Sequence, residues 1–283
     1  MKRILFSLAL ALMTGAGILS AQEGYDRNTF TSSTGYTLLY RSLDPLQAKP
    51  GRKYPLVLFL HGAGERGTDN ELQLVHGSGM FLNPYNRDHF PAYVVFPQCP
   101  PDGFWAYDPS VLKGNDFGRY LPADAPLTEE IRSVKELIDS YIASGKVDPK
   151  RIYVMGLSMG GMATFDLVLR YPDLFAAAVP ICGAVNPDRI TEKPKTKFRI
   201  FHGDADTAVL VDASRAAYRK LTSLGAKVEY TEYPGAGHGV WNMAFSEPDF
   251  FSWLFRQHKV GRTRRTHKNW SRRGTIPSGS MSY

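Results

Sequence analysis

The sequence predicts an α/β fold in which helices cover both faces of a mostly parallel central sheet. Three observations support it. Apolar runs without polar alternation recur along the chain, as in parallel strands that are buried on both faces. A segment with helical apolar spacing lies between two of these runs. The chain has 283 residues, which is long enough for one large α/β domain. The continuous apolar runs lie at 56–60, 92–96, 152–156, 176–181 and 198–201.

Turn and capping signals predict the remaining elements. A hairpin is expected at 31–43, with Gly35 at its turn. Thr128 suits the N-cap of a helix that ends at Gly145. The run at 228–233 alternates between apolar and polar residues, as an edge strand does. The apolar positions of the predicted helix are Ile131, Val134, Leu137, Ile138, Tyr141 and Ile142.

The segment Gly156-Leu157-Ser158-Met159-Gly160 has the GxSxG pattern of a nucleophile elbow. An apolar run precedes it and a predicted helix follows it. In such a turn, small residues flank a serine whose hydroxyl is exposed above the sheet. Ser158 is therefore the candidate nucleophile, and the alternative is a glycine-rich loop that matches the pattern by chance.

An acid and a base follow this serine in the order that a catalytic triad requires. Asp206 lies just past the run at 198–201, and His238 lies just past the run at 228–233. Each candidate thus follows the carboxyl end of a separate strand. Asp204 is two residues from Asp206, is equally ionisable, and remains a rival for the acid.

From about residue 54 to residue 257 the chain resembles the α/β-hydrolase superfamily, in the elbow and in the order of its Ser, Asp and His candidates. The superfamily often shows His-Gly, two residues, Asp, two residues and Val at the acid, which favours Asp206 here. Many lipases that resemble this chain carry a helical lid where it has only 183–197, so we expect no lid domain and an open site.

Within the superfamily, several motifs resemble a group of secreted bacterial serine esterases. This group is similar to the feruloyl and acetylxylan esterases and to the catalytic domain of prolyl oligopeptidase and its relatives. The resemblance indicates this group of enzymes more firmly than it indicates a particular substrate. The motifs are the HGAGERG loop at 61–67, Asp69-Asn70, the turn Pro97-Gln98-Cys99-Pro100, His238 followed by Trp241, and Trp253-Leu254.

An ester hydrolase also needs backbone N–H donors for the oxyanion. Met159 supplies one by its place directly after the nucleophile, and the 61–67 loop supplies the other through Ala63, or through the neighbouring Gly64. His61 and His202 precede glycines at strand ends, and we interpret both as structural hydrogen-bonding residues. No cluster has metal-ligand spacing, so we expect neither a metal nor a cofactor.

Two tryptophans are candidate substrate-binding residues. Trp105 lies in the aromatic-rich stretch 97–126, which leaves the sheet edge where ligands bind in such folds. Trp241 closely follows His238 and either lines the pocket or packs beneath the histidine loop. The aromatic residues of the long stretch either form an acyl or sugar platform or pack the loop down. They are Phe104, Trp105, Tyr107, Phe117 and Tyr120.

The N-terminal residues predict export of the protein, and the C-terminal residues predict a solvent-exposed tail. Residues 1–21 have the charged, apolar and small-residue regions of a signal peptide, with cleavage after Ala21, and their apolar run is short for a membrane anchor. Residues 22–258 form the expected catalytic domain. Residues 259–283 carry seven of the 34 basic residues and no acidic one. We interpret this basic tail as disordered, with binding to an acidic polymer or lipid surface as the alternative.

Without this tail the basic and acidic residues balance at 27 each, which argues against nucleic-acid binding. The chain has two cysteines. Cys99 and Cys182 follow strands that two other strands separate in the superfamily order, and about 14 Å is too far for a disulfide. We therefore expect two free thiols.

These observations predict a secreted or periplasmic serine carboxylesterase with the triad Ser158, Asp206 and His238. Its expected substrates are short acyl or hydroxycinnamoyl esters, small or linked to polysaccharide. The enzyme alternative is a serine peptidase of prolyl-oligopeptidase type, although the chain has no length for a selecting domain. The non-enzyme alternative is a binding protein on a hydrolase scaffold. The sequence does not indicate an oligomeric state or an integral membrane segment in the mature chain.

Overall fold

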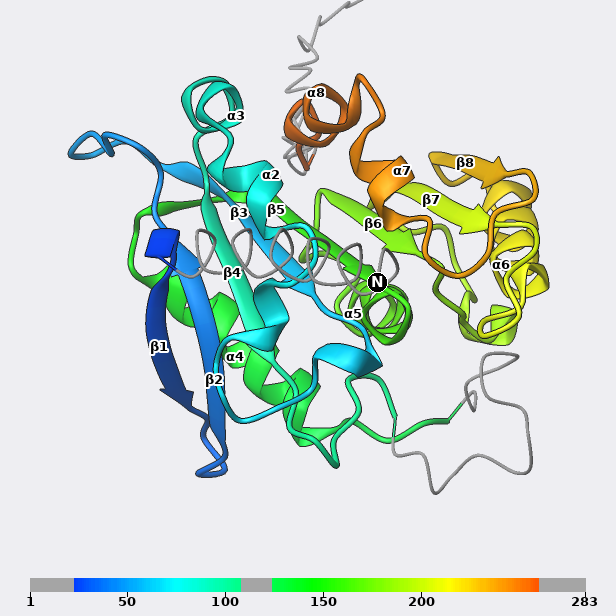
Figure 1. Ribbon diagram of the computed structural model, residues 1–283, viewed down its shortest axis with the longest axis horizontal. Coiled ribbons are helices and arrows are strands. Elements are labelled where there is room, and N and C mark those ends of the chain that lie inside the picture. The colour runs from blue at the N-terminus through cyan, green and yellow to red at the C-terminus, as the bar shows by residue number, and fades with distance from the viewer. Residues whose placement is uncertain (1–22, 108–123, 260–283) are drawn as a thin grey trace, which may run out of the picture.

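The computed structural model describes residues 23–107 and 124–259. The predicted signal peptide, the predicted basic tail beyond residue 259, and Phe117 and Tyr120 of the predicted platform lie outside this range. The described residues form one eight-stranded sheet with the strand order β1-β2-β4-β3-β5-β6-β7-β8. Figure 1 shows it from β1 at the left to β8 at the right. The strands are β1 (Asp26–Thr31), β2 (Thr37–Leu43), β3 (Tyr54–Leu60), β4 (Tyr93–Gln98), β5 (Val147–Leu157), β6 (Ala177–Ile181), β7 (Lys197–Gly203) and β8 (Val228–Tyr233).

The sheet is parallel from β4 to β8, while β1 and β2 are antiparallel to their neighbours. β1 and β2 form the predicted hairpin, and Gly35 has a φ of 84° at its turn. β8 is the predicted edge strand. The bounds of β5 differ from the expected ones, because the strand begins at Val147, ahead of the apolar run. Val147 pairs with Tyr54 of β3, and an irregularity in the register separates this pair from the ladder that starts at Ile152.

Helices cover both faces of the sheet, as predicted. One apolar core includes side chains of α4, α5 and α6, and the other includes side chains of α2, α7 and α8. The alternate residues Leu56, Leu58 and Leu60 of β3 pack in the first core, while Val57 and Phe59 pack in the second. This division explains why the strand sequence has no polar alternation. The α-helices are α2 (Ser78–Leu82), α3 (Pro84–His89), α4 (Glu129–Ala143), α5 (Met159–Arg170), α6 (Val211–Ser223), α7 (Trp241–Phe245) and α8 (Phe250–Phe255).

The predicted helix at 128–145 is α4. The Thr128 hydroxyl accepts a hydrogen bond from the Ile131 N–H at 3.2 Å, and Gly145 has a φ of 74° after the helix end. The segment between β6 and β7 contains only the short 3-10 helix η4 (Pro187–Arg189). It therefore holds no helical lid, as expected from its length.

The carboxyl ends of β5, β6, β7 and β8 lie side by side along one edge of the sheet. Loops that leave these ends carry Ser158, Cys182, Asp206 and His238. Residues separated by up to 80 positions in the chain are thereby brought together, and the candidate site is built at this edge.

Candidate active site

Ser158 stands at the sharp turn between β5 and α5 with a φ of 54° and a ψ of −118°. A non-glycine residue in this conformation is strained, as the serine of a nucleophile elbow is. The turn brings α5 so close to β3 that a Cβ atom on Gly160 would lie 2.0 Å from the Leu60 carbonyl oxygen. A Cβ on Gly156 would lie 2.4 Å from the Gly160 carbonyl oxygen. Both positions of the motif therefore require glycine, because a side chain would collide with neighbouring backbone atoms.

The three candidate triad residues form one hydrogen-bonded chain. The His238 Nε2 atom lies 2.8 Å from the Ser158 Oγ atom, and its Nδ1 atom lies 2.7 Å from the Asp206 Oδ2 atom. The His238 side chain is 26% exposed, whereas the Asp206 side chain is fully buried. The base is therefore open to a ligand on one side and held by a buried carboxylate on the other.

The Asp206 carboxylate is bound on both oxygens. Its Oδ1 atom accepts hydrogen bonds from the backbone N–H groups of Ala208 and Val209, at 2.9 and 3.0 Å. Burial opposes ionisation of this carboxyl group. Hydrogen bonds from His202, His238 and the Val209 N–H nevertheless hold the pKa of Asp206 well below its usual range.

Asp204, the rival acid, points elsewhere. Its Oδ1 atom accepts a hydrogen bond from the Gly235 N–H at 2.6 Å, in the loop that precedes His238. The structure therefore brings Asp206, and not Asp204, to the histidine.

Both predicted oxyanion donors lie at helix starts beside the serine. Met159 is the first residue of α5, and Ala63 is the first residue of the 3-10 helix η1 (Ala63–Glu65). A Cβ atom on Gly62, the N-cap of η1, would lie 3.5 Å from the Ser158 Cβ atom, so this loop passes directly beside the elbow. N–H groups in the first turn of a helix have no partner within the helix, which suits them to an oxyanion.

His61 braces this loop, as interpreted from the sequence. Its Nδ1–H donates to the Gly62 carbonyl at 2.6 Å, and its Nε2 atom accepts from the Cys99 N–H at 3.0 Å. Burial lowers the pKa of His61 to about 4. The ring is therefore neutral at pH 7 and joins the end of β3 to the end of β4.

The prediction that Trp105 binds substrate is wrong. Its side chain is fully buried, and its indole N–H donates to the His61 carbonyl at 3.1 Å. Phe104 and Tyr107 are also buried. Because the indole has no exposed surface and its N–H is already hydrogen-bonded, it cannot contact a substrate. The described aromatic residues of this stretch therefore pack the loop against the core of the protein.

Trp241 lies at the catalytic histidine, half-buried at the start of α7. Its ring centroid is 5.8 Å from that of His238, at an interplanar angle of 89°. The Trp241 ring centroid also lies 5.0 Å from that of the His76 ring, whose Nε2 atom lies 3.5 Å from the Glu65 Oε1 atom. Sequence reasoning missed His76, because no spacing connects it with the triad motifs.

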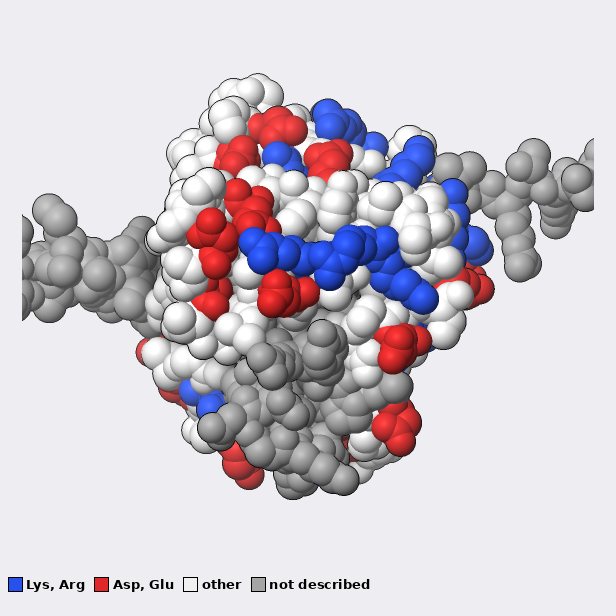
Figure 2. Space-filling view, turned by 90° about the vertical axis from the view of Figure 1, so that its right-hand side faces the viewer, with Lys and Arg blue, Asp and Glu red and all other residues white. Residues whose placement is uncertain are grey.

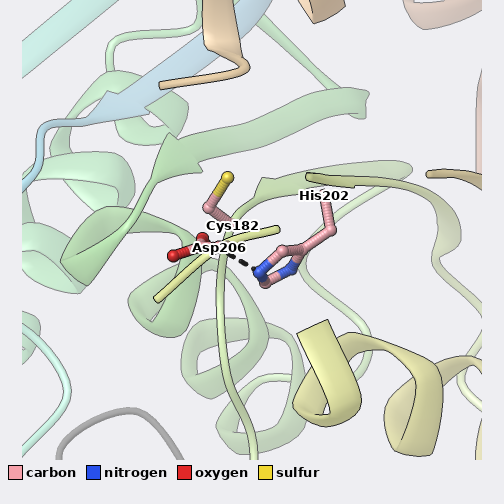
Figure 3. A group of neighbouring side chains, drawn as sticks. All are labelled: Cys182, His202 and Asp206. Atoms are coloured by element: carbon pink, nitrogen blue, oxygen red, sulfur yellow. Dashed lines mark ion pairs between the residues drawn. The ribbon is translucent and has the colours of Figure 1, made fainter. Parts of the chain in front are cut away.

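A buried group of Cys182, His202 and Asp206 adjoins the triad (Figure 3), with one ligand-type atom of each within 4.8 Å of the others. Each of these atoms has a hydrogen-bonding partner in the protein. Cys182 Sγ lies 3.2 Å from the His238 carbonyl, and His202 Nε2 lies 2.8 Å from the Val209 carbonyl. The group fits a hydrogen-bond network behind the triad.

Both cysteines are free, as predicted, and both are buried. Cys99 follows β4 and Cys182 follows β6, and β3 and β5 lie between these strands. Burial raises the pKa of the Cys182 thiol to about 12, so the thiol is protonated beside Asp206.

On the face that contains α6 and the β8 edge, Lys and Arg side chains form a band with acidic side chains above and below it (Figure 2). Arg215 of α6, for example, pairs with Asp212 and Glu232. Across residues 23–107 and 124–259, no helix has the length and apolar character needed to cross a membrane.

Comparisons with known proteins agree with this geometry. Residues 45–249 match the phospholipase/carboxylesterase family. Carboxylesterase SOBER1 of Arabidopsis thaliana is 29% identical over 217 residues, which cover 72% of this chain and 90% of that protein. Feruloyl esterase B of Neurospora crassa is 28% identical over 186 residues, or 65% of this chain and 55% of that protein.

Among solved structures, a thermostable esterase is 34% identical with a TM-score of 0.76, and the match covers 84% of this chain and 64% of that one. The family match over residues 45–249 includes the elbow, the acid loop and the histidine loop. The chain therefore belongs to the phospholipase/carboxylesterase family of the α/β-hydrolase superfamily and is a carboxylesterase-type hydrolase.

Proposed function

We propose that the chain is a secreted or periplasmic serine carboxylesterase that hydrolyses short acyl or hydroxycinnamoyl esters, including esters linked to polysaccharide. The observation that carries the proposal is the hydrogen-bonded chain from Ser158 through His238 to Asp206. A buried carboxylate, an imidazole and a partly exposed, strained serine in this order are the parts of acyl transfer by a serine nucleophile.

In the proposed reaction, the Ser158 Oγ atom attacks the ester carbonyl while His238 takes its proton. Asp206 stabilises the charged imidazole, and the N–H groups of Met159 and Ala63 bind the oxyanion. The C–O bond to the alcohol then breaks, and His238 returns the proton to the departing oxygen. Water, activated by the same histidine, attacks the acyl-enzyme and releases the acid and the free serine. No cofactor enters these steps.

The substrate proposal rests on the surroundings of the serine. The segment between β6 and β7 adds only the short η4 over this edge of the sheet, which favours a bulky or polymer-linked ester over a long acyl chain sealed from water. Trp241 offers an aromatic surface beside His238. The similarity to a feruloyl esterase supports a hydroxycinnamoyl group.

A substrate panel tests the function. The mature protein and the Ser158→Ala variant are assayed with p-nitrophenyl acetate, longer acyl esters, methyl ferulate, acetylated xylan and a peptide amide. We expect the wild-type protein to cleave esters but not the peptide amide. The Ser158→Ala variant should cleave neither, although it should have the same unfolding temperature as the wild-type protein. Ester cleavage retained in the variant would overturn the nucleophile, and cleavage of the amide alone would make the protein a peptidase.

Export has its own test. Expression of the full chain in a bacterial host with a secretory pathway should give a mature protein that begins at Gln22, as N-terminal sequencing would show. An intact residue 1 on the exported protein would contradict the signal peptide.

A further inference from the structure

We infer that His202 is a positioning residue for the triad, because it is a second histidine that donates a hydrogen bond to the Asp206 oxygen used by His238. This inference rests on the proposed function, since it assigns a role within the same triad. His202 contacts the Asp206 carboxylate from the buried side, so it acts on the reaction only through Asp206.

The contacts of His202 define the role. Its side chain has no exposed surface, and its Nε2 atom lies 3.1 Å from Asp206 Oδ2 and 2.8 Å from the Val209 carbonyl oxygen. The same Oδ2 atom lies 2.7 Å from His238 Nδ1. A single carboxylate oxygen is thus within hydrogen-bonding distance of two imidazoles, the partly exposed ring of His238 and the buried ring of His202. Figure 3 shows the contact between His202 and Asp206.

The neighbours of His202 assign its proton. Both groups near Nε2, a carbonyl and an ionised carboxylate, only accept hydrogen bonds, so Nε2 carries the hydrogen. The Val209 carbonyl oxygen at 2.8 Å and the Asp206 Oδ2 atom at 3.1 Å share this one donor. The Nδ1 atom lies 2.8 Å from the Ser214 Oγ atom. The single hydroxyl hydrogen of Ser214 has two acceptors within reach, this nitrogen and the Gly183 carbonyl oxygen at 3.1 Å. In the neutral Nε2–H form of the ring, Ser214 donates to Nδ1, which is the nearer of the two.

These contacts fix the orientation of the Asp206 carboxylate through both of its oxygens. The N–H groups of Ala208 and Val209 hold Oδ1, and His202 holds Oδ2 from the core. Ser214 on α6 anchors His202 in turn, so the acid loop is tied to the helix that follows it. His238 therefore meets a carboxylate whose orientation is set before substrate binds, which is the form of preorganisation that triads require.

A shared oxygen also changes the pH response. A second donor on Oδ2 withdraws negative charge from the hydrogen bond to His238, so the carboxylate favours the protonated base less strongly than it would alone. The other titratable groups that face this pair are Cys182 after β6, whose thiol is protonated, and Glu232 on β8, which is paired with Arg215. Loss of the His202 donor should therefore move the acidic limb of kcat/KM to higher pH.

Two substitutions at His202 separate positioning from packing. His202→Leu removes the donor, whereas His202→Gln keeps an N–H donor at a similar distance from the backbone. For His202→Leu we expect kcat to fall about 10-fold, which is the scale of one hydrogen bond to a charged group. We also expect the midpoint of its acidic limb to rise by about half a pH unit. For His202→Gln we expect both quantities to return towards wild-type values.

The outcomes distinguish this role from the function on which it rests. Ester cleavage retained in Ser158→Ala would overturn the triad and, with it, the role of His202. An inactive Ser158→Ala variant together with equal acidic limbs in wild type, His202→Leu and His202→Gln would overturn only the role of His202.

A spectroscopic measurement keeps the inference testable even if His202→Leu does not fold. Long-range ¹H–¹⁵N spectra of the folded wild-type protein report which ring nitrogen of each histidine carries the hydrogen. We expect the Nε2–H form for His202, with a deshielded N–H signal that disappears in His202→Gln. The Nδ1–H form would leave no hydrogen to donate to Asp206 and would overturn the inference.

Discussion

The Ser158 Oγ atom lies 2.8 Å from the His238 Nε2 atom, although 80 residues separate them along the chain. The sheet order explains this contact. Ser158 leaves the end of β5 and His238 leaves the end of β8, while β6 and β7 lie between these strands and contribute Cys182 and Asp206. Because the four strands are parallel, all four loops meet at one edge.

The first prediction compares two aspartates that the sequence alone did not separate. Asp206→Asn should lower kcat by about 10⁴-fold, because an amide at this position favours the wrong histidine tautomer. Asp204→Asn keeps an oxygen that can accept from the Gly235 N–H, so we expect kcat within about 3-fold of wild type. Steady-state kinetics on one p-nitrophenyl ester checks both variants. Equal losses in the two variants would contradict the assignment of Asp206.

Much of the fold could be predicted because its strands are buried on both faces. Burial on both faces forces continuous apolar runs, and the runs at β3, β4, β5, β6 and β7 appear in the sequence for that reason. The Ser, Asp and His candidates were visible because each follows a strand end next to small residues. The free thiols followed from strand order alone, since β3 and β5 separate the strands that precede Cys99 and Cys182.

Side-chain direction could not be predicted in the same way. Trp105 follows a sheet edge where ligands bind, yet its indole points inward to the His61 carbonyl. His202 was expected to be structural, but its contact with Asp206 depends on the turn at Gly203 that folds the loop back onto the ring. His76 contacts Trp241 from the segment that precedes α2, a distant part of the chain. Such contacts depend on tertiary packing, which motif spacing does not encode.

The second prediction concerns the close approach of the elbow to β3. Gly160→Ala would place a Cβ atom 2.0 Å from the Leu60 carbonyl oxygen. This oxygen belongs to the backbone of β3 and the Cβ is fixed to the backbone of α5, so neither can rotate aside. We expect a loss of more than about 4 kcal/mol in the free energy of unfolding, or no folded protein. Gly79→Ala in α2 is the matched control, because its Cβ would meet nothing within 4 Å. Urea denaturation should show the control within about 1 kcal/mol of wild type, and an equally stable Gly160→Ala would contradict the packing at the elbow.

The third prediction is a pH dependence of stability that originates at His61. Burial lowers the pKa of His61 to about 4 in the folded protein, while an unfolded histidine takes up a proton near pH 6.5. Between these values the unfolded state binds more protons, so stability is lost as the pH falls from about 6.5 to about 4, by about 3 kcal/mol.

The matched variant for this measurement is His61→Gln, which keeps an acceptor for the Cys99 N–H but does not titrate. Its free energy of unfolding, measured in urea at pH 7, 5.5 and 4.5, should fall less steeply with pH than that of the wild-type protein. Glu65 and Asp206, whose pKa values are also lowered, lose their contributions at lower pH. Parallel pH profiles for variant and wild type would show that the buried ring is not the source.

The fourth prediction tests whether Trp241 contacts substrate. The indole contacts the rings of both His76 and His238 and remains half-buried, so an aromatic acyl group on Ser158 would have a ring surface beside it. For Trp241→Ala we expect kcat/KM to fall about 10-fold on methyl ferulate, mainly through KM, because an aromatic contact with its buried area is lost. On p-nitrophenyl acetate, whose acyl group is a single methyl carbon beyond the carbonyl, we expect a loss below about 3-fold. Trp241→Phe should recover most of the activity on ferulate, because it restores an aromatic ring next to His238. An equal fall in kcat on both esters would instead mean that the indole packs beneath the histidine loop and acts only through the position of His238.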